Sequence, residues 1–148
     1  MTKASMIDVS EKPISFREAI ARGKIVLKPE TVKLIKEKKV EKGDVESVAS
    51  VAAILAVKKT PELIPLCHPI PVSYVGVDFS YGENYVEVTV TVRSKAETGV
   101  EMEALAGATA ALLVVWDMVK KYEKDERGQY PTTKIEEVRV ESKLKSPI

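Results

Sequence analysis

The chain has 148 residues, of which 45% are hydrophobic and 30% are charged, and this composition fits one globular domain over residues 1–148. A single cysteine excludes an internal disulfide framework, and a formal net charge of +1 argues against a general nucleic-acid binder. No apolar run approaches the roughly 20 residues of a membrane helix, and the N-terminus lacks the apolar core of a signal peptide, so we expect a soluble cytoplasmic protein.

The beginning of the chain gives a mixed signal. Residues 1–13 predict a loosely ordered arm that ends at a proline. Beyond it, the apolar residues of segment 16–20 suit one face of a helix, whereas the apolar run at 25–27 suits a strand that stops at Pro29. Helix and strand both remain open for this segment.

Two helices are predicted next. Pro29 suits the first turn of a short helix over PETVKLIKEKKV. The segment KGDVESVASVAAILAVKKT indicates a stronger helix with Asp44 as its N-cap and Pro61 at its close. In this stronger helix, apolar residues recur at helical spacing, namely Val48, Val51, Ala52, Leu55 and Ala56.

The second half of the chain predicts a hairpin, a long helix and a last strand. SYVGVDFS and YVEVTVTVR alternate apolar and polar residues around the turn YGEN. A helix is predicted from about Gly99 to Lys124, and TKIEEVRVESKLK alternates again. The order predicts an α+β, ferredoxin-like (βαββαβ) fold, in which helices cover one face of an antiparallel sheet. The other face is either exposed or covered by a partner.

Charged side chains stand out at both ends of the long helix, because its middle carries no charge. Asp117 and Lys120 share a helix face, so they form either an ordinary ion pair or an acid–base pair with perturbed pKa values. Glu103 lies about 40° from Asp117 around the helix axis. The small residues between them, Gly107 and Ala110, permit the close approach of a ligand, another chain or a neighbouring helix.

Two shorter stretches add weaker signals. Lys42 precedes a helix N-terminus, where free backbone N–H groups bind phosphates, although a solvated lysine is the commoner case. The segment LIPLCHP holds the only cysteine and the only histidine, Cys67 and His68, between prolines that stiffen it. One His–Cys pair has too few ligands for a metal, and adjacent side chains diverge, which argues against a nucleophile pair. The segment is built either to position a side chain or simply to pack.

Taken together, these stretches resemble one known family. The similarity runs from about Met6 to Lys145 and is to the cyclic pyranopterin monophosphate synthases of molybdenum cofactor biosynthesis, the MoaC family. It rests on MIDVSEKP, KGDVESVASVAAILAVKKTPELIPLCHPIP, ETGVEMEALAGATAALLVVWDMVKK and IEEVRVESK. The resemblance implies a lyase without a cofactor or metal that converts 3′,8-cyclo-7,8-dihydro-GTP to cyclic pyranopterin monophosphate and releases pyrophosphate. It also implies a homohexamer, a trimer of dimers with active sites at the dimer interfaces.

The resemblance also implies roles for individual residues. Asp117 of WDMVK matches the catalytic aspartate, and Lys120 and Lys42 match two essential lysines. The positions that match substrate-contacting or nearby polar residues are Leu66, Cys67, His68, Met102, Glu103, Glu101, Lys58, Arg17 and Asp8. The chain departs from the family at Glu97, where a lysine is usual, and in its glycine-free tail ESKLKSPI.

The expected chemistry is general acid–base catalysis with lysines that stabilise phosphate charge. Because Lys42 and Asp117 come from different segments, we expect two subunits to supply them to one pocket. Two other interpretations come from different classes. One is a ferredoxin-like RNA-binding or small-molecule-binding regulatory domain, although the hairpin lacks the aromatic-rich strand of RNA-binding sheets. The other is a structural oligomer in which Asp117 and Lys120 form a subunit ion pair.

Overall fold

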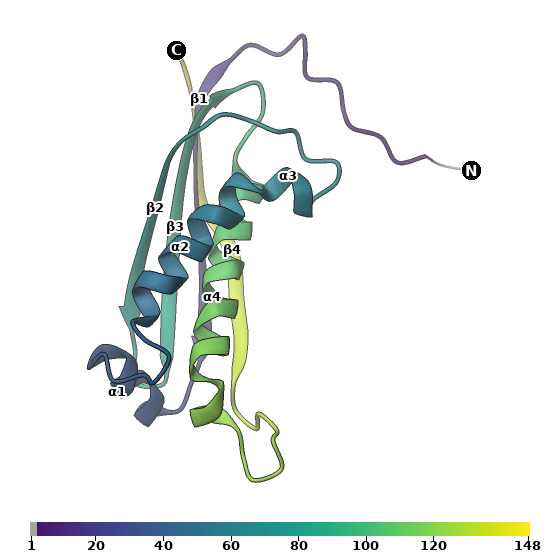
Figure 1. Cartoon of the computed structure of the whole chain (residues 1–148). Helices are drawn as coiled ribbons and strands as arrows, with labels where there is room; N and C mark the ends of the chain where they lie inside the picture. The colour runs from purple at the N-terminus through teal and green to yellow at the C-terminus, as the bar shows by residue number, and fades with distance from the viewer. Residues whose placement is uncertain (1–2) are drawn as a thin grey trace.

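A four-stranded antiparallel sheet forms one layer of the computed structural model, which describes residues 3–148 (Figure 1). The strands are β1 (Ser15–Val26), β2 (Val72–Tyr81), β3 (Tyr85–Ala96) and β4 (Lys134–Pro147), in the spatial order β2-β3-β1-β4. This order, with helices between β1 and β2 and between β3 and β4, is that of the ferredoxin-like fold, so the predicted fold class is confirmed.

The helices lie on one face of this sheet (Figure 1). They are α1 (Pro29–Lys36), α2 (Val45–Lys58), α3 (Thr60–Leu63) and α4 (Glu101–Glu123). α4 packs along α2, β1 and β3, whereas α3 and α1 lie near its N-terminal and C-terminal ends. Pro29 begins α1 as predicted, and α2 ends where expected, but Pro61 lies inside α3 rather than in a connecting loop.

The segment for which the sequence allowed either a helix or a strand forms the strand β1, which lies inside the sheet. Its residues alternate between a buried and a half-buried side along the whole strand, with Ala19, Ala21 and Ile25 fully buried. β1 pairs with β3 along one edge and with β4 along the other. Two hydrogen-bonded ladders stabilise the extended chain on both edges and override the short stretch of helical spacing.

A glycine sets the close contact between α4 and its neighbours. A Cβ atom on Gly107 would lie 2.8 Å from Val57 Cγ2 and 3.2 Å from Val90 Cγ1. Both distances are tighter than ordinary van der Waals contact, so a side chain here would push α4 away from α2 and β3. Close helix packing therefore accounts for Gly107, whereas Ala110 lines an apolar groove on the outer side of α4.

The apolar spacing noticed in α2 belongs mainly to its outer face. Val48, Val51 and Leu55 are exposed in the single chain, whereas α2 packs on α4 through Val45, Ala49, Ala53 and Val57. The small side chains of the packed face let the two helix axes approach closely. α2 is thus apolar on both sides, and Leu113 and Met102 are likewise exposed on α4.

α4 also has the length and composition of a membrane-spanning helix. Half of the apolar window of α4 is buried inside the protein, against the sheet and α2. A core helix of a soluble protein has the same character, and the packing of α4 is of that kind.

A buried carboxylate joins three segments at the C-terminal end of α4. The Glu123 side chain is fully buried and accepts hydrogen bonds from the Lys28 N–H (3.0 Å), the Thr31 hydroxyl (2.5 Å) and the Thr133 hydroxyl (2.6 Å). Lys28 and Thr31 begin α1, and Thr133 precedes β4. Glu123 therefore fixes the start of α1 and the start of β4 to the end of α4.

Replacing Glu123 by alanine leaves these three donors without an acceptor in the interior. We expect Glu123→Ala to lower the free energy of unfolding by roughly 2–4 kcal/mol, measured by denaturant unfolding at matched protein concentration. Glu126→Ala, at an exposed position in the next loop, is the control and should change it by less than about 0.5 kcal/mol. Equal effects of the two substitutions would show that the buried network contributes no special stability.

Candidate active site

A cluster of charged side chains surrounds Asp117 near the C-terminal end of α4. Lys120 Nζ lies 3.1 Å from Asp117 Oδ1, and Lys42 Nζ lies 3.4 Å from Asp117 Oδ2. The Lys42 ammonium also donates to the main-chain oxygen of Asp117 at 3.0 Å. The hydrogen bond from Lys120, followed by the charge of Lys42, holds the pKa of Asp117 below its usual range. The cluster therefore presents two ammonium groups around one ionised carboxylate.

The loop after α1 brings Lys42 to this cluster within a single chain. Val40 is buried, the Glu41 N–H donates to the Tyr122 hydroxyl at 2.9 Å, and the Glu41 carboxylate pairs with Lys121 of α4. The expectation that different subunits supply Lys42 and Asp117 to one pocket is therefore wrong. Sequence distance concealed this contact, because the loop folds back onto the last turns of α4.

An open depression of about 440 Å³ adjoins this cluster. Its lining combines Asp117 and Lys120 with the apolar side chains Leu113, Trp116 and Ile135. An apolar floor beside paired ammonium groups suits a ligand that has both a ring and an anionic group.

A second cavity, of about 470 Å³, lies at the opposite end of α4. Three segments meet there, namely the N-terminal arm, the proline-framed strip after α3 and the first turn of α4. Five of the residues expected to contact substrate line this cavity: Leu66, Cys67, His68, Glu101 and Met102. Several other lining residues were not singled out from the sequence, because their side chains carry no distinctive chemistry: Ser5, Ile7, Val9, Ile64 and Thr98.

At the second cavity, the half-buried Cys67 lies beside the buried Glu103. The Cys67 thiol lies 3.6 Å from Glu103 Oε2, and Glu103 is only 1% exposed. Glu103 Oε1 has no hydrogen-bond partner within residues 3–148. Burial raises the pKa of Glu103, and burial together with the nearby carboxylate raises the pKa of Cys67 to about 11. Cys67 is therefore a thiol at neutral pH, which supports a positional rather than a nucleophilic role.

Two of the remaining predicted site residues, Arg17 and Lys58, lie outside the lining of the second cavity, and an additional cation, Lys143, reaches its edge. Arg17 is buried and donates to the main-chain oxygens of Ala96 (3.4 Å) and Glu97 (3.1 Å), so it holds the segment that leads into α4. Lys143 of β4 lies 3.3 Å from the Glu101 carboxylate and brings a cation to the cavity edge. Lys58 is exposed at the end of α2 and lines neither of the two cavities.

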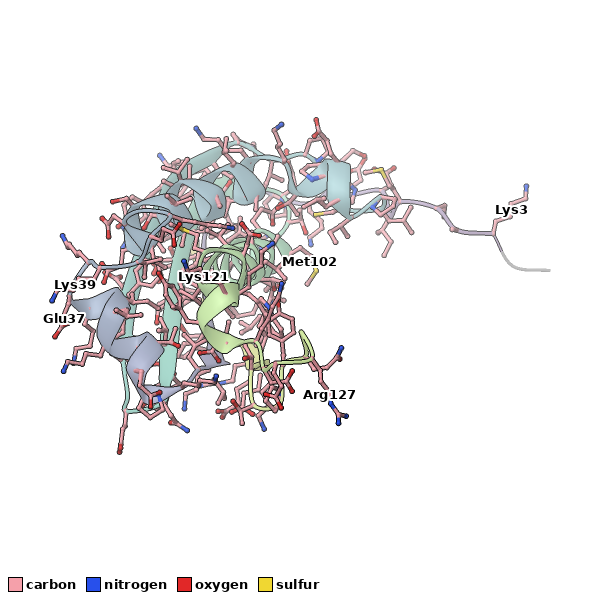
Figure 2. All side chains as sticks on the ribbon, turned by 60° about the horizontal axis from the view of Figure 1, so that its bottom comes forward. Lys3, Glu37, Lys39, Met102, Lys121 and Arg127 are labelled. Atoms are coloured by element: carbon pink, nitrogen blue, oxygen red, sulfur yellow. The ribbon has the colours of Figure 1, made fainter. Side chains whose placement is uncertain are left out.

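His68 and Asp8 connect the second cavity to the arm. His68 Nε2 lies 2.6 Å from the main-chain oxygen of Ile7. The Asp8 carboxylate is exposed and accepts a hydrogen bond from the Ser10 N–H at 2.8 Å. The Ser10 side chain, followed by this N–H, lowers the pKa of Asp8. In Figure 2 the arm leads away from the body of the protein toward Lys3. In Figure 2, Glu37 and Lys39 lie at the opposite end of the protein from the arm, just after α1.

The two groups of residues do not share a pocket in one chain. Glu103 and Asp117 are 14 positions apart on one straight helix, which separates them by about 21 Å. Figure 1 shows the same division, with the arm and α3 at one end of α4 and α1 at the other. Across residues 3–148, no three His, Cys, Asp or Glu side chains lie together in a way that could hold a metal ion.

The fold and the two sites together define a class of protein. The class is a ferredoxin-like α+β protein with a lysine–aspartate–lysine cluster at one end of its long helix and a cavity beside a buried carboxylate at the other. The sequence model of the MoaC family matches residues 6–146, and the chain belongs to this family.

Curated relatives agree with the family assignment. A protein of Pyrococcus horikoshii is 61% identical over 141 residues, which cover 95% of this chain and 89% of the relative. A protein of Sulfurisphaera tokodaii is 56% identical over 146 residues, which cover 99% and 97%. A third, from Methanoregula boonei, is 55% identical over 143 residues, which cover 97% and 92%. Each of the three is named a probable cyclic pyranopterin monophosphate synthase.

The raised pKa of Cys67 predicts slow alkylation at neutral pH. Because the thiolate is the reactive form, we expect the rate of reaction with iodoacetamide to rise with pH until about 11, as measured by mass spectrometry of the single cysteine. Glu103→Gln removes the neighbouring charge and should shift the rate profile to lower pH, although burial keeps it above that of a free thiol. A wild-type profile with its midpoint near pH 8.5, the usual value for cysteine, would contradict the raised pKa.

Proposed function

We propose that this protein is a cyclic pyranopterin monophosphate synthase, a lyase of molybdenum cofactor biosynthesis. It converts 3′,8-cyclo-7,8-dihydro-GTP to cyclic pyranopterin monophosphate and releases pyrophosphate. Membership of the MoaC family carries the proposal, because relatives that align with nearly the whole chain have this name. The Lys42–Asp117–Lys120 cluster supports it, because the reaction needs both proton transfer and charge stabilisation at phosphate.

Each member of the cluster has a role in this chemistry. Lys42 and Lys120 stabilise the negative charge that develops as the cyclic phosphate forms and pyrophosphate leaves. Asp117 contacts both ammonium groups and is ionised, so it orients them toward the substrate. Proton transfer by these three groups needs no cofactor, and none is part of the proposal.

The complete active site contains residues from two subunits. A nucleotide-derived substrate that contacts Asp117 and His68 together needs the two ends of α4 side by side, and one straight helix holds them apart. An antiparallel arrangement of two chains places the Lys42–Asp117–Lys120 cluster of one beside the second cavity of the other. The exposed apolar side chains Val51, Leu55 and Leu113 supply a surface for such contact. A soluble, cytoplasmic homohexamer built as a trimer of such dimers completes this proposal.

A structural oligomer without catalysis is the alternative that the ion pairs alone permit. It explains Asp117 with its two lysines, and a second chain could also donate to the buried oxygen of Glu103, which has no partner among the described residues. It does not explain why relatives that align with nearly the whole chain are named as synthases. We therefore favour the enzyme.

Turnover of the cyclised dihydro-GTP tests the proposed function directly. We expect pyrophosphate and the cyclic pterin product with the wild-type chain, and at least a roughly 100-fold lower kcat with Lys42→Ala or Lys120→Ala. Lys39→Ala is the matched control, because Lys39 is exposed and pairs only with Glu37 among residues 3–148. If the wild-type chain makes no product, or if both cluster variants keep the activity of the control, the assigned chemistry is wrong.

Mixed oligomers test the shared active site. In a dimer of one Asp117→Ala chain and one His68→Ala chain, one pocket carries both defects and the other is intact. Random pairing makes half of the dimers mixed, so refolding the two inactive variants together should restore about a quarter of wild-type activity. Lys42→Ala mixed with Asp117→Ala is the control and should restore none, because those residues belong to the same cluster.

Mass measurements must first show that mixed oligomers form in both refolding experiments. Recovery in the Lys42 and Asp117 mixture, or its failure in the Asp117 and His68 mixture, would show that the division between the two ends of α4 is wrong.

A further inference from the structure

The contact between His68 and the arm fixes which ring nitrogen carries a proton. His68 Nε2 lies 2.6 Å from the main-chain oxygen of Ile7. A carbonyl oxygen only accepts hydrogen bonds, so in the neutral imidazole Nε2 must be the donor. The other nitrogen, Nδ1, is then left with its lone pair and is free to accept a proton or a hydrogen bond.

A short turn in the arm aims the Ile7 carbonyl at the ring. The Asp8 carboxylate accepts a hydrogen bond from the Ser10 N–H at 2.8 Å, and the Lys12 N–H donates to the main-chain oxygen of Val9 at 3.0 Å. An aspartate that binds the backbone two residues ahead forms an Asx-turn, which stabilises a bend. The bend follows Ile7 directly and changes the direction of the arm at that point.

Asp8 itself lies outside the cavity that this turn helps to form. Ile7 and Val9 line the second cavity, whereas Asp8, between them, is exposed and is not part of the lining. Successive side chains of an extended segment point to opposite sides, which explains this alternation. Asp8 can therefore influence the cavity through the backbone that it holds, and its charge also interacts with His68.

We propose that Asp8 is a positioning residue that acts through the Ile7 carbonyl to hold His68 in its Nε2-protonated form, with Nδ1 directed to the substrate. This role stands in place of the substrate contact that resemblance implies for Asp8. The effect on turnover rests on the proposed function, but the effect on the ring does not. During the reaction Nδ1 accepts a proton from the substrate while the Ile7 carbonyl stabilises the proton on Nε2 and the ring orientation.

The single histidine makes the proposal measurable in the intact protein. Long-range 1H–15N spectra of the full chain give one set of imidazole signals, recorded without substrate at a pH where the same spectra show a neutral ring. We expect the proton on Nε2 and a signal from this proton that is protected from exchange with water. Asp8→Ala should abolish the protection, whereas Asp8→Asn should keep it, because the amide oxygen can still accept from the Ser10 N–H.

Turnover of the same variants gives the second measurement. Asp8→Ala should lower kcat roughly tenfold with KM changed by less than about twofold, since misplacement of a catalytic group costs up to about 100-fold. Asp8→Asn should restore kcat to near the wild-type value. Circular dichroism and the oligomer mass confirm that both variants are folded.

Three results would overturn the proposal. They are a proton on Nδ1 in the wild-type chain, an Nε2 proton that exchanges equally fast in wild type and Asp8→Ala, and an Asp8→Asn variant that behaves like Asp8→Ala. The last result would show that Asp8 acts through its charge. If the spectra follow the expectation while the wild-type chain makes no product, the proposed function fails and the positioning contact stands.

Discussion

The packing of α4 against the sheet and α2 is the constraint on which the rest of the structure depends. Gly107 and the alanines of α2 allow this contact to be close, and the uncharged middle of α4 makes it apolar. α4 is held rigidly by this packing along its whole length. The Lys42–Asp117–Lys120 cluster lies near its C-terminal end, and the second cavity lies at its N-terminal end.

Each end has its own means of holding the chemistry in place. At the C-terminal end, Glu123 fixes α1, and Tyr122 and Lys121 hold the loop that carries Lys42. At the N-terminal end, Arg17 fixes the segment before α4, and prolines stiffen the strip that carries His68. The segments that carry Lys42 and His68 are therefore held in place by contacts with other parts of the chain.

Much of the fold followed from regular patterns in the sequence, and the exceptions have physical causes. The hairpin and α4 were predictable because their periodicity is long and unbroken. β1 was not, because pairing on both edges decides its conformation and a single segment does not contain that information. The buried face of α2 was missed for a related reason: alanine packs closely against α4, so the larger valines and leucine lie on the outside.

The candidate site was also predictable only in part. The residues with distinctive chemistry, such as Asp117, Lys120 and His68, could be found from the sequence and from family resemblance. Their grouping could not, because it depends on a loop that folds back and on the length of a helix. The contribution of Ile7 was invisible, because a main-chain carbonyl has no signature in the sequence.

Glu103 Oε1 is buried and has no hydrogen-bond partner within residues 3–148. A buried carboxyl oxygen in this position costs folding free energy, because it loses the hydrogen bonds that water gives it in the unfolded chain. The interior beside Cys67 is therefore not optimised for stability alone. Any group that donates a hydrogen bond to this oxygen would recover part of that free energy.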